Sequence, residues 1–265
     1  MHVVSWNVNS IRSRQARLLS WLRQHEPDIV LLQETKCDDA TFASADFTGA
    51  YEALGYEAAH HGHDHWNGVA ILSRVGIEHV RRGFPGVNQP PFDDPRLISA
   101  TCGGLDVLSA YVPNGRALDD PNYLVKLVWL ERLRSVIDVD RPTLLTGDFN
   151  VAPTDADIYD PSRWRGKTHA SPPERAAIDA LVDLGLSDVT RDWLPGPDVF
   201  TWWSYRPGQF ERNRGLRIDL ALCTLDVAAR IERVWIDTDE RTDDHPVEKP
   251  SDHAPLVLEL TPDRT

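Results

Sequence analysis

The sequence predicts an α/β fold in which two β-sheets pack against each other and helices cover them. About ten short strand-like segments alternate with only a few helical ones, and that ratio is typical of two packed sheets in one domain. Hairpins and helical crossovers both occur, so we expect mixed sheets. No repeat, linker or low-complexity segment divides the chain, and a single domain is expected over residues 1–265.

Apolar runs and alternating apolar residues predict the strands. The run at residues 28–34 is continuous, as in a strand that is buried on both faces. Gly103-Gly104 separates two strand-like segments and is a strong signal for a two-residue hairpin. The predicted strands are residues 3–8, 28–34, 56–60, 68–73, 97–102, 105–112, 143–148, 200–205, 216–223, 231–236 and 255–260.

Three segments predict helices, each with apolar residues at helical spacing. They are residues 11–25, residues 122–137 and the segment that follows Ser171. The third begins with the capping box Ser171-Pro172-Pro173-Glu174 and ends at Gly185. Loops are expected at residues 38–50, 85–95 and 152–170.

The charge of the chain is unevenly distributed. The net charge of −13 argues against a polyanionic partner, but arginines gather in residues 12–23 and 201–217. Such patches can bind phosphates, and an Mg²⁺ ion would add positive charge. For Arg14, Arg17 and Arg23 we favour a solvated helix face.

Other sequence features indicate where the protein works. No apolar run approaches the roughly 18–20 residues that span a bilayer, and the first residues resemble a strand rather than a signal peptide. We therefore expect a cytoplasmic protein. The cysteines, which are Cys37, Cys102 and Cys223, predict neither a disulfide framework nor a zinc site.

Polar residues stand at the ends of several predicted strands. Gly147-Asp148-Phe149-Asn150 follows an apolar run, and an acid and an amide two positions apart on a strand point to the same face. A turn with an Asx hydrogen bond could also explain this tetrapeptide alone. The other strand-end groups are Asn7, Glu34, Tyr111, Asp219, Asp252 and His253. Acids and amides that converge from different strands are typical of a hard-cation site, with Mg²⁺ as the expected ion.

His253 differs from these groups in its chemistry. It could act as a general base or as a hydrogen-bond donor in a transition state. Asp219 is a candidate to orient its ring, because an acid inside an apolar strand needs a partner. For each residue taken singly, a satisfied structural polar group is the alternative.

Six motifs together resemble the bacterial exonuclease III family of class II abasic-site endonucleases, in the endonuclease/exonuclease/phosphatase superfamily. The resemblance covers residues 3–260 with the motifs in family order. The motifs are Trp6-Asn7-Val8-Asn9-Ser10-Ile11-Arg12, Leu32-Gln33-Glu34-Thr35-Lys36, Tyr111-Val112-Pro113-Asn114-Gly115, Gly147-Asp148-Phe149-Asn150, Gly215-Leu216-Arg217-Ile218-Asp219 and Lys249-Pro250-Ser251-Asp252-His253-Ala254-Pro255.

The resemblance implies a four-layer αββα sandwich with a metal-containing cleft between its two sheets. Glu34 is implied as the principal metal ligand, and the metal-site candidates are Asn7, Glu34, Asp148, Asn150, Asp252 and His253. The implied ion is Mg²⁺, with Mn²⁺ possible, and one or two ions remain open. Asp148 would orient or deprotonate the attacking water, and Asn150 would position that water or the phosphate. Tyr111 would donate to a phosphate oxygen, and His253, held by Asp219, would stabilise the transition state or act as the base.

The resemblance also implies contacts with DNA. Trp202, Leu216 and Ile218 match an apolar pocket for a flipped sugar without a base, whereas Trp203 is interpreted as core. The residues implied to contact the backbone are Asn9, Arg12, Lys36, Asn114, Arg214 and Arg217.

A histidine cluster departs from the family pattern. His60, His61, His63 and His65 could bind a transition metal. Alternatively, the segment tunes substrate binding with a pH dependence.

The function expected from this resemblance is Mg²⁺-dependent DNA repair. The enzyme would hydrolyse the phosphodiester 5′ to an abasic site, degrade duplex DNA 3′ to 5′ and remove 3′-blocking phosphates. Its partner would be double-stranded DNA with abasic or 3′-blocked lesions, and a monomer is expected. The alternatives are a superfamily phosphomonoesterase, a less specific endonuclease and a catalytically silent DNA-binding module.

Overall fold

The structure is a computed structural model that describes residues 1–86, 89–242 and 248–261. Its strands form two six-stranded sheets. The first sheet has the order β11 (Ile231–Ile236), β12 (Leu256–Leu260), β1 (His2–Asn7), β2 (Ile29–Gln33), β4 (Val69–Ser73) and β3 (Glu57–His61). The second has the order β5 (Glu78–Arg82), β6 (Leu97–Cys102), β7 (Leu105–Tyr111), β8 (Thr143–Asp148), β10 (Asp219–Thr224) and β9 (Leu186–Asp188).

Both sheets are mixed, as predicted. β1 pairs in parallel with β2, and β7 pairs in parallel with β8. The other neighbouring strands in the described ranges pair antiparallel. The carboxyl ends of each parallel pair lie at one edge of its sheet, which is where functional side chains can gather.

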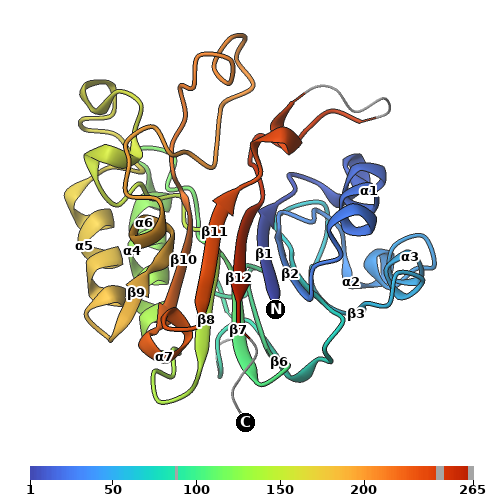
Figure 1. Ribbon diagram of the computed structural model, residues 1–265. Helices are drawn as coiled ribbons and strands as arrows, with labels where there is room; N and C mark the ends of the chain where they lie inside the picture. The colour runs from blue at the N-terminus through green and yellow to red at the C-terminus, as the bar shows by residue number, and fades with distance from the viewer. Residues whose placement is uncertain (87–88, 243–247, 262–265) are drawn as a thin grey trace.

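Helices cover the outer faces of both sheets (Figure 1). α1 (Gln15–His25), α2 (Asp39–Phe42) and α3 (Thr48–Glu52) lie beside the first sheet, and α4 (Pro121–Arg134) and α5 (Pro172–Val182) beside the second. The remaining helices are α6 (Val189–Trp193), α7 (Leu225–Ala228), η1 (Ile11–Ser13), η2 (Asp155–Asp157), η3 (Pro161–Arg163) and η4 (Thr238–Arg241). None of the helices in the described ranges is long and apolar enough to cross a membrane.

Three buried apolar clusters account for the four layers. One lies between the two sheets and includes Ile29 and Leu31 of β2. Val30 and Leu32 point to the opposite face, where they pack with Leu18 and other residues of α1. A third cluster joins the second sheet to α4 and α5. A strand buried on both faces requires the continuous apolar run seen in β2, and the predicted αββα sandwich is confirmed.

Several predicted elements were wrong. Residues 38–50 are not loop throughout, because Asp38 caps α2 by accepting from the Thr41 amide, and Phe42 and Tyr51 bury their rings. Residues 200–205 form only isolated bridges at Trp202, and β10 begins at Asp219 rather than at residue 216. β5 was missed because its sequence Glu-His-Val-Arg-Arg is largely exposed and lacks apolar alternation.

Candidate active site

The strand ends bring the predicted polar residues together. Asn7 is the last residue of β1, and Glu34 follows the last residue of its parallel neighbour β2. In the second sheet, Asp148 ends β8 opposite Tyr111 of β7 on one side and Asp219 of β10 on the other. The register alone therefore places three of the predicted site residues side by side.

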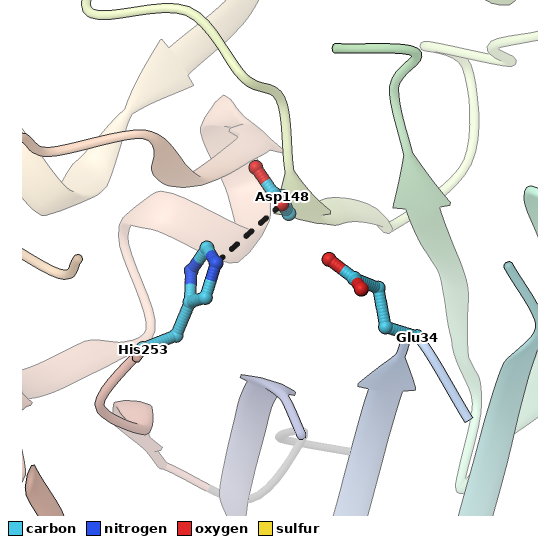
Figure 2. A group of neighbouring side chains, drawn as sticks. All are labelled: Glu34, Asp148 and His253. Carbon is cyan, nitrogen blue, oxygen red and sulfur yellow. Dashed lines mark ion pairs between the residues drawn. The ribbon is translucent and has the colours of Figure 1, made fainter. Parts of the chain in front are cut away.

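Glu34, Asp148 and His253 form a group that could hold a metal ion (Figure 2). One ligand atom from each residue lies within 4.8 Å of the other two. Asn7 joins the two acids, because its Nδ2 donates to Glu34 Oε1 at 2.8 Å and to Asp148 Oδ2 at 2.9 Å. Carboxylate oxygens in such a group are the ligands that Mg²⁺ prefers.

His253 is held between two carboxylates. Its Nδ1 lies 2.8 Å from Asp219 Oδ2, and its Nε2 lies 3.7 Å from Asp148 Oδ2. Burial alone lowers the pKa of His253, but the charges of Asp219 and Asp148 and the bond to Asp219 raise it to about 10. The ring is therefore an imidazolium at neutral pH, and this favours the donor role over the base role.

The pKa of Asp148 is also raised, but here burial is what raises it. Burial raises the pKa of Asp148 to about 7, an effect that His253 opposes and that Asp219 and Glu34 strengthen. Its Oδ1 accepts from the backbone amide of Asn150 at 2.9 Å. A carboxylate with a pKa near 7 suits general base catalysis at neutral pH.

Asn150 is fixed by bonds to both ends of its carboxamide. Its Oδ1 accepts from Asn114 Nδ2 at 2.9 Å and lies 3.1 Å from His169 Nε2, while its Nδ2 donates to the Val112 carbonyl at 3.0 Å. Because Oδ1 has these partners, the second hydrogen of Nδ2 is the group that Asn150 can offer to a substrate. His169 was missed because it lies in a segment predicted to be loop, with no motif around it.

Tyr111 stands beside the acidic group as a neutral phenol. Burial first, and then the charge of Glu34, hold the pKa of Tyr111 well above its usual range. The Arg96 guanidinium carbon lies 4.8 Å from the centroid of the Tyr111 ring, and Arg96 Nη1 is buried without a partner among the described residues. Arg96 was also missed, since a lone arginine after a proline-rich loop carries no sequence signal.

Asp252 does not join Glu34, Asp148 and His253. Its Oδ1 accepts from Asn9 Nδ2 at 2.9 Å, and its Oδ2 accepts from Trp202 Nε1 at 3.0 Å. Asp252 thus links Asn9, which follows β1, to Trp202.

A cavity of about 350 Å³ opens beside Trp202, and Trp164 and Arg214 also line it. Leu216 and Ile218 are only 1% and 2% exposed, so they pack beneath Trp202 rather than offering a surface of their own. Trp203 is buried with Phe200, as predicted for a core residue.

The prediction that Arg217 contacts DNA was wrong. Arg217 is 1% exposed, and its guanidinium bonds to Asp157 Oδ1 at 2.6 Å and Asp188 Oδ1 at 2.9 Å. Asp157 and Asp188, which come from different segments, therefore neutralise the charge of Arg217 inside the fold. Of two other predicted DNA-contact residues, Lys36 pairs with Glu34 at 2.7 Å, and Arg12 is exposed with a bond to Thr41.

The solvated helix face predicted for Arg14 and Arg17 was also wrong. Arg17 is 3% exposed and pairs with Glu240 at 2.7 Å. Arg14 Nη2 donates to the Tyr205 hydroxyl at 2.9 Å. Both side chains connect α1 and its N-terminus to the C-terminal part of the chain.

The histidine cluster forms no group of three metal ligands in the described residues. His60 is buried, with Nε2 at 2.8 Å from Thr35 Oγ1 and Nδ1 at 2.7 Å from Asp39 Oδ1. Burial lowers the pKa of His60 to about 4 although Asp39 opposes the shift. His60 is therefore a neutral structural residue at physiological pH.

Comparisons with known proteins agree with this architecture. The sequence pattern of the Endonuclease/Exonuclease/phosphatase family matches residues 4–253. Exodeoxyribonuclease III of Haemophilus influenzae is 36% identical over 98% of this chain and 100% of its own length.

Two solved structures are similar over nearly the whole chain. The 3′ phosphatase NExo from Neisseria, bound to a product DNA hairpin, has a TM-score of 0.91 and 37% identity and covers 98% of this chain and 99% of its own. An AP endonuclease from Archaeoglobus fulgidus has a TM-score of 0.90 and 36% identity with the same coverage.

Proposed function

The chain belongs to the endonuclease/exonuclease/phosphatase family, and on that basis we propose that it is an Mg²⁺-dependent DNA repair nuclease of the exonuclease III type. It hydrolyses the phosphodiester 5′ to an abasic site, leaving a 3′-hydroxyl and a 5′-deoxyribose phosphate. It also trims duplex DNA from the 3′ end and removes 3′-phosphates. The observation that carries the proposal is the group of Glu34, Asp148 and His253, whose ligand atoms lie within 4.8 Å of one another.

The donor set fits a divalent cation. Glu34, with Asp148 and His253 close by, would hold the ion, with Mn²⁺ as a possible substitute for Mg²⁺. Burial raises the pKa of Asp148, and the charges of Asp219 and Glu34 add to that shift, while the Lys36 ammonium lies against Glu34. When bound, Mg²⁺ would supply positive charge that stabilises the negative charge developing in the reaction.

The protein side chains account for the proton transfers and the oxyanion contacts. Asp148 takes a proton from the water that attacks phosphorus, and the bond from phosphorus to the 3′-oxygen breaks. His253 donates from Nε2 to a non-bridging oxygen that gains charge, and Asp219 keeps the ring protonated. The phenol of Tyr111 and the amide of Asn150 are further donors at the phosphate.

Recognition of the lesion is proposed for the cavity beside Trp202. A sugar without a base has no stacking or pairing to lose, so it leaves the duplex at lower cost than a normal nucleotide. Arg12 and Arg214 would contact the backbone, which positions the duplex without reading its sequence. We also propose that the protein acts as a cytoplasmic monomer.

A nicking assay tests the proposal. The substrate is an end-labelled duplex with one tetrahydrofuran abasic analogue, incubated with Mg²⁺ or with EDTA. We expect one cut, 5′ to the lesion, only with Mg²⁺, and its loss in Glu34→Gln. Tight binding without cutting would contradict the proposal and indicate a silent DNA-binding module. Duplexes with a recessed 3′ end and with a 3′-phosphate at a nick test the other two activities separately.

A further inference from the structure

A fully buried ion pair joins α4 to α5 beneath the active site. Lys126 of α4 and Glu174 of α5 are both 0% exposed and contact each other through Nζ and Oε1. Neither side chain belongs to the group around Glu34. Buried ion pairs contribute little net stability because both charges lose their hydration, so the bonds that this pair makes to its surroundings need a separate explanation.

Lys126 reaches the backbone of two site residues. Its ammonium donates to the Asn150 carbonyl at 2.7 Å and lies 3.4 Å from the Asn114 carbonyl. Together with Glu174, these partners account for the three N–H groups of the ammonium. Lys126 therefore joins the segment after β7 to the segment after β8.

Glu174 binds a third segment, residues 168–171, beside Lys126. Its Oε1 accepts from Thr168 Oγ1 at 2.7 Å and from the His169 amide at 2.9 Å. Its Oε2 accepts from the Ser171 amide at 3.0 Å and from Ser171 Oγ at 2.6 Å. The backbone of residues 168–171 is thereby fixed, and it presents the His169 ring to Asn150.

Asn150 is consequently held from both its backbone and its side chain. Its φ of 51° lies in the left-handed region, which asparagine adopts more readily than most residues other than glycine. Lys126 holds the carbonyl of Asn150. Asn114 and His169, whose segments the ion pair also binds, contact its Oδ1.

We propose that the Lys126–Glu174 pair is a positioning device for the reaction, which fixes the carboxamide of Asn150 against the phosphate. This inference rests on the proposed nuclease function and assigns that site two residues which touch no reacting atom. Because the pair acts on placement, its loss lowers kcat more than it raises KM. A displacement on the order of 1 Å can cost about 10²-fold in rate.

The test compares Lys126→Met, Glu174→Gln and the double variant in the abasic-duplex assay. Each single variant leaves an unpaired or mismatched buried group and melts at a lower temperature, whereas the double variant removes both charges and regains part of the loss. We expect kcat to fall by about 10²-fold in all three, with KM for DNA changed by less than about threefold. If a single variant does not fold, the double variant carries the test.

A matched control separates positioning from stability. Arg17→Met also breaks a buried ion pair, but among the described residues the side chain of Arg17 bonds to Glu240, to the Glu248 carbonyl and to the Thr242 carbonyl, all in the C-terminal part of the chain. The kcat of Arg17→Met should stay near the wild-type value when each protein is assayed at the same number of degrees below its own melting temperature.

Two results would separate failure of this inference from failure of the proposed function. Recovery of wild-type kcat in the double variant, as its melting temperature recovers, would overturn the positioning role while leaving the nuclease intact. Absence of cutting by the wild-type protein would instead overturn the nuclease function and, with it, this inference.

Discussion

Replacement of Asp219 by asparagine tests the proton on His253, because this carboxylate is the partner of the ring at 2.8 Å. Burial lowers the pKa of His253, and the charges of Asp219 and Asp148 raise it to about 10. Asparagine keeps the size of the side chain and removes its charge. The pKa of His253 should then fall to its ordinary value of about 6.5 or lower.

The expected loss of activity depends on pH. With a pKa of about 6.5, roughly 3% of the molecules are protonated at about pH 8, whereas a pKa of about 10 leaves nearly all of them protonated. The variant should therefore lose about 30-fold in kcat/KM at about pH 8 and less than about twofold at about pH 6. The sign follows from the raised pKa, since the active, protonated form is lost as pH rises.

Single-turnover nicking of the abasic duplex, measured across this pH range, provides the assay. Asp188→Asn is the matched control, because it also removes an ion-paired carboxylate, partly buried, but one that pairs with Arg217 rather than with His253. Its ratio to the wild-type rate should not vary with pH. A ratio for Asp219→Asn that is equally constant would refute the reasoning that Asp219 acts by keeping His253 protonated.

Three further predictions concern other residues. Asp148→Asn should reduce cutting by more than about 10³-fold and leave DNA binding, measured by fluorescence anisotropy, within severalfold of wild type; retained turnover would move the base role elsewhere. Arg214→Ala should reduce the slope of log affinity against log salt by about one, whereas Arg217→Met should lower the melting temperature without changing that slope; equal slope losses would contradict the burial of Arg217. His60, with its pKa lowered to about 4, stays neutral in the folded protein while the unfolded chain takes up a proton below about pH 6.5, so stability should fall by roughly 3 kcal/mol between these two pH values. Urea unfolding of the wild type and of His60→Gln checks this, and a parallel pH dependence of the two proteins would show that His60 is not responsible.

Strand ends were the part of the site that the sequence predicted well. Apolar runs locate the strands, and a polar residue directly after such a run must lie at the edge of a sheet. Asp148 and Glu34 were found in this way. Their strands, β8 and β2, belong to different sheets, so the two residues meet because the sheets pack face to face.

The partners of the charged residues could not be predicted from the sequence. Arg217 and Lys126 carry no local sign of burial, because the acids that neutralise them are distant in the sequence. Glu174 was recognised only as part of a capping box, although the same carboxylate also receives Lys126. Such contacts depend on how helices pack on a sheet, which periodicity does not specify.

Irregular segments were the other source of error. Residues 200–205 are rich in aromatic residues and were expected to form a strand, but they form only isolated bridges, one of which joins Trp202 to His253. Trp202 is thereby connected to the segment that carries Asp252 and His253, with Asp252 bonded to its indole. Tertiary contacts here override local strand propensity.

The chemistry of the cut tests the central claim most directly. A duplex with one natural abasic site, whose aldehyde permits elimination whereas the tetrahydrofuran analogue does not, is cleaved with Mg²⁺ in water enriched in heavy oxygen, and the product ends are identified by mass spectrometry. Attack by a water that Asp148 activates predicts a 3′-hydroxyl on one fragment and one heavy oxygen in the 5′-deoxyribose phosphate of the other. An unsaturated sugar at the 3′ end without heavy oxygen in the phosphate would show elimination at the sugar and contradict the proposed hydrolysis.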